Sequence, residues 1–319
     1  MLAVAAALVS AVAYGSGDFA GGLATRRASV IRVALLTQSV SAVVIGIAVW
    51  SSGAPRPTAG SVAWGMLAGL AGACGALALL AGFRHAVFSV AAPLSAVGAA
   101  GFSVLAGLLL GERPSPLALT GIVLALPAIV GVSVSARARP GAPPAPGGPM
   151  PLGGPLPVRG PMPPGAEDAA ADPAAARRRF APGGMSYGLV AGACFALLFI
   201  GLNRAGSGSG FWPVFCSQTT GLATITCVAV VTREFRLPAG RSRWLAGLAG
   251  LGSGPGTILY FVATHRGQLA VAAVISSLYP AVTIMLARVL VGERLTTVRL
   301  AGLVLAGASV ALIAVGGAR

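Results

Sequence analysis

Asp18, in the segment AYGSGDFAGG, is the residue of this sequence best suited to chemistry at membrane depth. Three of the seven acidic residues lie in a proline-rich segment, and the other four are Asp18, Glu112, Glu234 and Glu293. Of these four, only Asp18 lies well inside an apolar stretch. Burying a carboxylate in lipid is costly unless it is paired, hydrated or protonated. We therefore expect Asp18, with Tyr14 beside it, to line a cavity and either bind a cation or carry a proton.

A second interpretation of Asp18 stays open. The residue could lie near the end of its helix, where it would cap a glycine-interrupted turn or pair with Arg26 or Arg27. The two interpretations differ in depth, because only the first places the carboxylate in the interior of the membrane.

Gln38 and Gln218 occupy matching places in two apolar stretches, each flanked by hydroxyl residues. A buried amide in lipid needs a hydrogen-bonding partner on another helix or in a hydrated cavity. The pair is therefore predicted either to bind substrate from two sides or to join two helices.

Proline and further polar residues extend the predicted cavity. Pro255, among the glycines of GLGSGPGTILY, is expected to unwind its helix and free carbonyl groups near a substrate site. Close packing through Gly250 and Gly254 is the alternative. Helix breaks are also predicted at Pro93 and Pro280. The remaining cavity candidates are Tyr260, Ser276, Ser277 and Tyr279.

Signatures of other chemistries are absent from the sequence. It has no phosphate-binding GxxxxGK[ST] loop, no HExxH and no GxSxG. Its four cysteines lie in apolar runs without a CxxC pair, as small core residues would. We expect no enzymatic activity, no cofactor and no metal.

The composition is that of a membrane protein. Hydrophobic residues make up 56% of the chain and charged residues 9%, with a mean hydropathy of +0.86, whereas soluble domains carry about 25% charged residues. All 22 basic residues are arginine, and they lie in short loops and one linker. Loop arginines are typical of membrane proteins, so the net charge of +15 does not indicate nucleic-acid binding.

Ten apolar stretches are long enough to cross a bilayer as helices, since a crossing takes about 20 residues. An all-α fold with ten transmembrane helices is predicted. The stretches are 2–23, 31–50, 62–82, 88–110, 116–135, 185–203, 211–231, 244–263, 269–291 and 298–316.

One segment interrupts this pattern. Residues 136–183 hold 13 of the 23 prolines and few large apolar side chains, which predicts a disordered tether. The tether separates two predicted domains, residues 1–135 and 184–319. Its role is left open.

The two predicted domains repeat each other. Residues 84–135 and 265–316 align without a gap and share 17 identities in 52 positions, among them Gly111-Glu112-Arg113 with Gly292-Glu293-Arg294. Each copy holds five helices, and because five is odd, the copies should cross the membrane in opposite directions. Glu112 and Glu293 are expected to interact with the helix that follows each turn and with the neighbouring arginine, in a structural rather than a substrate-binding role.

The repeated pattern of a proline-containing helix, a turn reading LLGE or LVGER and a following glycine-containing helix resembles the EamA domain of the drug/metabolite transporter superfamily. The resemblance covers both halves and leaves out the linker. It implies a ten-helix permease in the bacterial plasma membrane, often an exporter of amino acids, metabolites or drugs.

The sequence predicts a secondary transporter that moves a small organic solute by alternating access, linked to a proton gradient. A channel-like facilitator and a non-transporting membrane scaffold are the alternatives. The side bearing the predicted tether would carry 17 arginines and the other side five, which places both termini outside by the positive-inside rule, whereas the resemblance implies termini inside. Substrate and oligomeric state are not predicted.

Overall fold

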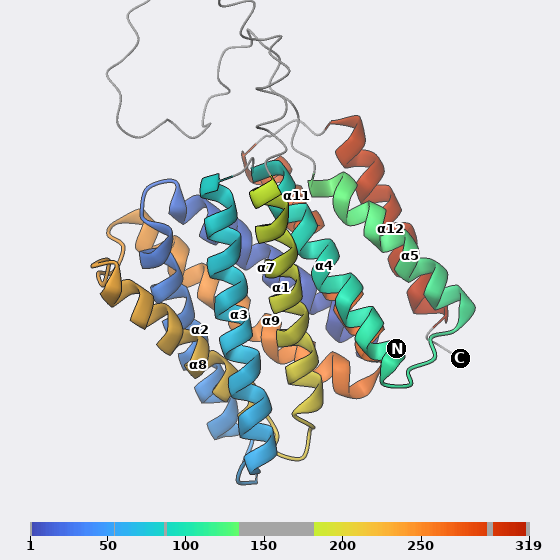
Figure 1. Ribbon diagram of the computed structural model, residues 1–319, viewed down its shortest axis with the longest axis horizontal. Coiled ribbons are helices and arrows are strands. Elements are labelled where there is room, and N and C mark those ends of the chain that lie inside the picture. Colours follow the sequence, from blue (N-terminus) through green and yellow to red (C-terminus); the bar gives the residue numbers. More distant parts are fainter. Residues whose placement is uncertain (1, 54, 86–87, 134–181, 292–295, 317–319) are drawn as a thin grey trace, which may run out of the picture.

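The protein is all-helical wherever the structure describes it (Figure 1). The computed structural model describes residues 2–53, 55–85, 88–133, 182–291 and 296–316, and no strand occurs among them. Residues 134–181, which include most of the predicted tether, lie outside the described residues. Apolar helices are the expected outcome in lipid, because a helix satisfies its backbone hydrogen bonds internally.

The helices fall in two groups along the chain. The first group is α1 (Leu2–Thr25), α2 (Val30–Ser51), α3 (Ala59–His85), α4 (Phe88–Leu109) and α5 (Pro116–Ser133). The second group is α7 (Pro182–Arg204), α8 (Trp212–Val231), α9 (Arg241–Arg266), α10 (Leu269–Ser276), α11 (Tyr279–Leu286), the π-helix η2 (Ala287–Val291) and α12 (Thr297–Gly316).

Eight spans of the described chain are long and apolar enough to cross a membrane. Two shorter apolar helices, Leu94–Leu109 and Pro116–Val132, lie at the places of the fourth and fifth predicted stretches. Each predicted stretch thus corresponds to a helical segment. The ninth stretch differs in kind, because α10, α11 and η2 share it and the chain turns at Ser277 and Leu278 between α10 and α11.

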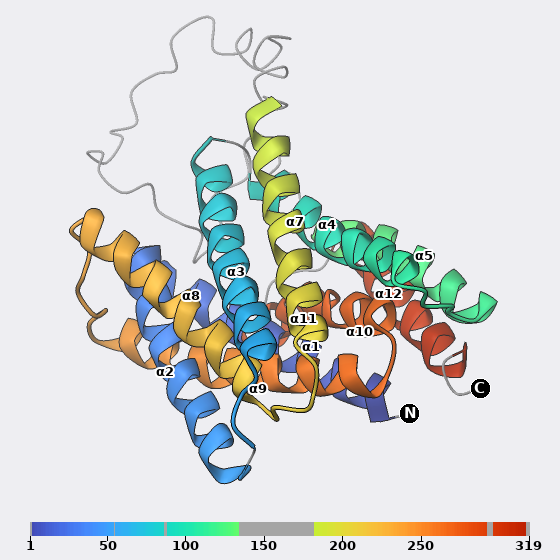
Figure 2. The ribbon, with the colours of Figure 1, turned by 60° about the horizontal axis from the view of Figure 1, so that its bottom comes forward.

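Long-range helix pairs build the bundle. Helix α1 packs along α9, α3 along α7, α2 along α8, and α5 along α12. Figures 1 and 2 show α3 beside α7 in both views, and α5 beside α12 on the side of the molecule where both termini lie. The two halves are therefore interleaved, and each pair joins a helix of one half to a helix of the other.

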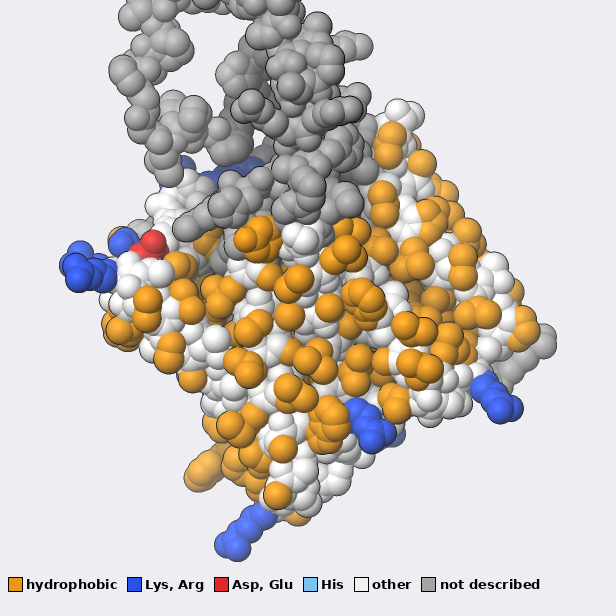
Figure 3. Space-filling model, viewed as in Figure 1, with side chains coloured by type: hydrophobic (Ala, Val, Ile, Leu, Met, Phe, Trp, Pro, Cys, Tyr) orange, Lys and Arg blue, Asp and Glu red, His pale blue; other side chains and the backbone are white. Residues whose placement is uncertain are grey.

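Small residues let these helices approach closely. A Cβ atom at Gly69 would overlap the backbone oxygen of Ser217, so α3 and α8 pack backbone to backbone there. Large apolar side chains point outward instead, as in Trp50, which is 92% exposed, and Val231, which is 82% exposed. Figure 3 shows a face covered with hydrophobic side chains, with the basic ones at its margins. This distribution suits a bundle whose outer surface faces lipid.

The cysteines differ from the prediction. All four are free, but Cys74 and Cys227 are exposed on their helices, and Cys194 and Cys216 are only half-buried. Their small apolar side chains are compatible with a lipid-facing surface, so an apolar stretch did not by itself place them in the core.

Candidate functional site

Asp18 lies within α1 and away from its ends. It precedes Thr25, the last residue of the helix, by seven positions, which is about 10 Å along the axis at 1.5 Å per residue. The helix is continuous through Gly15 and Gly17, so the glycine-interrupted end that the alternative interpretation assumed is absent from α1.

The side of α1 that carries Asp18 packs against other helices through the residues one turn before Asp18. Tyr14 and Gly15 precede Asp18 by four and three positions, and therefore lie on the same side of the helix. The Tyr14 ring packs on Gly256 of α9, and Gly15 lies against Tyr279 and Val282 of α11. Asp18 itself is exposed. Its carboxylate is thus accessible on a face that is turned toward the bundle.

Two phenols accompany this carboxylate. Tyr14 lies one turn before Asp18 on α1, and the backbone oxygen of Tyr279, at the start of α11, lies against Gly15 on the same side of that helix. No described residue forms a salt bridge with Asp18 or donates a hydrogen bond to it. The structure therefore brings together three of the predicted site residues, with an acid and two aromatic hydroxyl groups from two helices.

Hydroxyl residues that the sequence analysis did not single out position these phenols. The Tyr14 hydroxyl donates to Thr257 Oγ1 at 2.9 Å, and the Thr257 hydroxyl donates to the carbonyl of Ser253 at 3.0 Å. Thr283 Oγ1 donates to the carbonyl of Gly15 at 3.0 Å and joins α11 to α1. The spacing of Ser253 and Thr257, four positions apart on one face of α9, was the available sequence signal.

Ser276 and Ser277 lie where α10 ends. Their exposed fractions are 0% and 1%, and their hydroxyl oxygens have no hydrogen-bond partner among the described residues. Pro280 has no N–H, so the carbonyl of Ser276 lacks the donor that a continuous helix would supply. The interruption thus gathers buried polar groups directly before Tyr279.

Gln38 and Gln218 bind each other. The Gln218 Nε2 donates to Gln38 Oε1 at 2.7 Å across the interface of α2 and α8. Each amide is the partner of the other in this conformation. This geometry is the one expected of an interhelical link, and no described contact joins the pair to Asp18.

Tyr260 serves the packing of α9 on α7. It is fully buried, its hydroxyl donates to the carbonyl of Phe199 at 3.2 Å, and its ring stacks on the Phe199 ring with centroids 4.3 Å apart. One turn further along α9, Asn203 Nδ2 donates to Thr264 Oγ1 at 2.9 Å. Both contacts join the same two helices, and Tyr260 lies one turn after Gly256, the residue on which the Tyr14 ring packs.

Glu112 has a structural contact, but not with the predicted helix. Its Oε2 accepts the backbone N–H of Ala270 at 2.9 Å, and its Oε1 accepts that of Leu269. The carboxylate therefore caps α10, whereas the sequence analysis expected it to act on α5. Gly111 before it has φ +89°, a left-handed conformation that favours glycine. Arg113 is exposed.

The second copy of the repeated motif, Gly292, Glu293 and Arg294, lies outside the described residues. Helix α4 is not interrupted at Pro93, and α9 continues through Pro255. The predicted breaks at Pro93 and Pro255 are wrong for this conformation, whereas the third predicted break, at Pro280, lies beside the turn at Ser277 and Leu278. Gly250 and Gly254 pack against α2, and Gly252 and Gly256 against α1, so contacts on both sides hold α9 together although Pro255 removes one hydrogen bond.

The described residues contain no group of three or more side chains that could hold a metal ion. The accessible carboxylate, the two phenols and the unpartnered serine hydroxyls can instead accept or donate hydrogen bonds to a polar solute, and the carboxylate can exchange a proton. Together these groups define the candidate site.

Comparison with known proteins gives a family and a fold. The model of the EamA-like transporter family matches residues 1–134 and 182–315. No match is found among curated proteins. A solved structure described only as a crystal structure of a protein is similar over 99% of this chain and 98% of its own, with a TM-score of 0.72 and 16% sequence identity. At that identity the likeness concerns the fold alone.

Proposed function

Because the chain belongs to the EamA-like transporter family, and is thus a multi-pass membrane transporter, we propose that it is a secondary active transporter of a small organic solute. In this proposal two five-helix halves of opposite orientation surround one solute site in the bacterial plasma membrane. The site is exposed to either side of the membrane in turn, as in other transporters built from inverted repeats.

The contact between α5 and α12 is the observation that carries the proposal. Gly121 of α5 lies against Ile313 of α12, and Gly302 of α12 lies against Val132 of α5. At the repeat offset of 181 positions, Gly302 is the counterpart of Gly121 and Ile313 is the counterpart of Val132. The two halves therefore make the same contact with each other in both directions. The contacts run in opposite directions along the two helices, which is the arrangement expected for helices related by a twofold axis in the membrane plane.

A second pair of contacts obeys the same rule. Tyr14 of α1 packs on Gly256 of α9, and Phe195 of α7 packs on Gly75 of α3. Phe195 and Gly256 are the counterparts of Tyr14 and Gly75 at the same offset. These matched contacts support a relation between the halves that lets them exchange conformations, as alternating access requires.

The halves differ in charge at one matched position. The counterpart of Asp18 in the second half is Phe199, an apolar residue that stacks on Tyr260. At this matched pair of positions, only the first half carries a carboxylate. We assign it the coupling role: Asp18 takes up a proton from one side, and releases it to the other after the site has changed its exposure.

Solute binding in this proposal is assigned to the polar groups of α1 and of the junction between α10 and α11. Tyr14 and Tyr279 offer phenol hydroxyls, and Ser276 and Ser277 offer hydroxyls without partners among the described residues. Such a set suits a solute with several hydrogen-bonding groups, such as an amino acid or a polar metabolite. Export is the proposed direction.

Counterflow in proteoliposomes tests the mechanism. Metabolites that accumulate outside cells overproducing the protein, compared with cells lacking it, supply the candidate solutes. A carrier should show uptake stimulated by solute on the opposite side, whereas a channel-like facilitator would conduct without this stimulation and a scaffold would do neither.

Substitution of Asp18 tests the coupling role separately. We expect Asp18→Asn to keep solute exchange but to lose accumulation driven by a proton gradient, and Asp18→Glu to keep part of it. Unchanged proton-linked transport by Asp18→Asn, at an equal amount of protein in the membrane, would exclude the role of Asp18 while leaving the carrier mechanism intact.

A further inference from the structure

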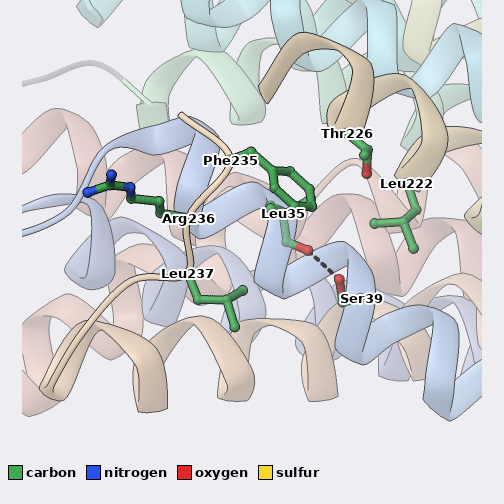
Figure 4. Close-up of a pocket in the computed structure, with 7 residues that line it drawn as sticks. All are labelled: Leu35, Ser39, Leu222, Thr226, Phe235, Arg236 and Leu237. Carbon is green, nitrogen blue, oxygen red and sulfur yellow. Dashed lines mark hydrogen bonds between the residues drawn. The ribbon is translucent and has the colours of Figure 1, made fainter. Parts of the chain in front are cut away.

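A pocket separate from the candidate site opens between α2 and α8 (Figure 4). It has a volume of about 390 Å³, within the range of roughly 300–1,000 Å³ usual for small-molecule sites. Two residues from each helix and three from the connection between α8 and α9 form its walls: Leu35, Ser39, Leu222, Thr226, Phe235, Arg236 and Leu237.

We place the membrane surface at the end of α8, a helix about one membrane crossing long, so the pocket begins there and extends into the hydrocarbon layer. Thr226 and Leu222 precede Val231, the last residue of α8, by five and nine positions, or about 7 and 13 Å at 1.5 Å per residue. Half of the hydrocarbon layer is about 15 Å thick. An occupant would therefore lie at the depth of the acyl chains of one leaflet.

The walls and the rim differ in chemistry. Figure 4 shows the side chains of Leu35, Leu222 and Phe235 around the pocket, while the guanidinium group of Arg236 points away from them. Arg236 is exposed. The pocket thus has a mainly apolar interior, with the hydroxyl groups of Ser39 and Thr226 on its wall and a cation at its edge, which matches a molecule with an apolar chain and an anionic head.

The surrounding surface is strongly basic. Seven arginines lie in residues 26–32 and 233–243, and Glu234 is the one acidic residue of these segments. Glu234 accepts a hydrogen bond from Ser29, and Ser242 Oγ donates to the carbonyl of Ala24 at 3.2 Å, so the two segments lie at the same end of the bundle. At the left margin of Figure 3, basic side chains gather where Figure 1 places the end of α8. Basic groups at this level attract anionic headgroups.

We infer that this pocket binds one phospholipid with an anionic headgroup. One acyl chain lies between α2 and α8, and the headgroup lies against Arg236 and its basic neighbours. The bilayer supplies this occupant at high concentration. The charge at the rim selects an anionic lipid over a zwitterionic lipid with the same chains. This inference does not depend on the solute, its coupling or its direction.

Photolabelling of the unmodified full-length protein tests the inference directly. The protein is reconstituted in phosphatidylcholine nanodiscs that contain a trace of phosphatidylglycerol with a photoactivatable acyl chain, and labelled peptides are mapped by mass spectrometry. We expect labels within residues 222–237, and we expect unlabelled phosphatidylglycerol to compete for them. Additional phosphatidylcholine or soluble glycerol phosphate should not compete.

Two variants and a control sharpen the test. Arg236→Gln should lower labelling of this peptide about five-fold, the factor that corresponds to one arginine near an anionic surface. Thr226→Phe, which fills the pocket, should abolish the labelling. Arg56→Gln is the control, because Arg56 is exposed in the connection of α2 to α3, at the other end of α2.

Several results would overturn the inference. These are labels spread evenly over the lipid-facing helices, equal competition by phosphatidylcholine, competition by soluble glycerol phosphate, and an undiminished signal in both pocket variants. Size-exclusion chromatography establishes that each variant is folded. If a variant fails this check, mapping and competition on the unmodified protein still decide the question.

Discussion

The carboxylate of Glu112 accepts the backbone N–H of Ala270 at 2.9 Å, across 158 positions of the chain. Together with its bond to Leu269, this contact caps the first turn of α10 and ties the connection between α4 and α5 to the second half of the protein. An acid at a helix N-terminus satisfies free N–H groups and interacts favourably with the helix dipole.

Removing this cap should destabilise the fold. We expect Glu112→Ala to lower the free energy of unfolding by about 1–2 kcal/mol, and Glu112→Gln to lower it by less, since the amide oxygen can still accept one N–H. Thermal unfolding of the purified protein in detergent measures the effect. Arg113→Ala, next to it and exposed, is the control and should leave the melting temperature nearly unchanged. Equal melting temperatures for all three variants would contradict the capping role.

The amide pair of α2 and α8 should behave as a unit. Gln38→Leu or Gln218→Leu alone leaves one amide without its partner, and we expect each to cost about 1 kcal/mol. The double variant should recover most of that loss, because both polar groups are gone. A double-mutant cycle of melting temperatures checks this prediction.

Transport by the same double variant separates the two interpretations of the glutamines. If the pair only joins helices, the double leucine variant keeps its transport rate at equal membrane levels. Loss of transport from a protein of normal stability would show that the amides also contact the solute.

Close packing at Gly69 should not tolerate even one methyl group. A Cβ atom there would overlap the backbone oxygen of Ser217, and backbone cannot move aside as a flexible side chain can. We expect Gly69→Ala to destabilise the protein by about 1–3 kcal/mol. Gly22 in α1 has no atom within 4 Å of such a position, so Gly22→Ala should be neutral or slightly stabilising. The melting temperature in detergent should therefore fall for Gly69→Ala and stay the same or rise slightly for Gly22→Ala.

The serines at the end of α10 should show opposite effects on stability and transport. Their hydroxyls are buried without partners among the described residues, so Ser276→Ala and Ser277→Ala should leave stability unchanged or raise it slightly. Transport should fall if these hydroxyls meet the solute when the site changes its exposure.

Ser10 provides the matched control for that measurement. It is equally buried, but its hydroxyl donates to the carbonyl of Gly256 at 2.8 Å. Ser10→Ala should therefore lower the melting temperature. Alanine variants of Ser276 and Ser277 that lose stability and retain transport would contradict the assignment of these serines to the solute pathway.

Continuity of α9 leads to a prediction for Pro255. Because the helix passes through this residue without a break, Pro255→Ala restores one backbone N–H and requires no rearrangement. We expect transport within about two-fold of the unmodified protein and an equal or higher melting temperature. A strong loss of transport would indicate that another conformation of the cycle does unwind α9 here.

The sequence alone determined the class of this protein, the position of each apolar helical segment and the family. These properties are local or compositional: a run of about 20 apolar residues specifies a membrane helix whatever its neighbours are, and the repeated GER turn can be read without coordinates. The distinctive place of Asp18 was also visible, because it is the acidic residue set well inside an apolar stretch.

Tertiary structure decided which residues meet. Glu112 caps a helix of the other half, the two glutamines bind each other, and Thr257 holds Tyr14; each contact joins positions more than 150 residues apart. The sequence predicted breaks at both Pro255 and Pro280, but α9 continues through Pro255 and the chain turns at Ser277 and Leu278, beside Pro280. Glycine contacts with two helices hold α9 together, so packing decides which of these prolines interrupts its helix.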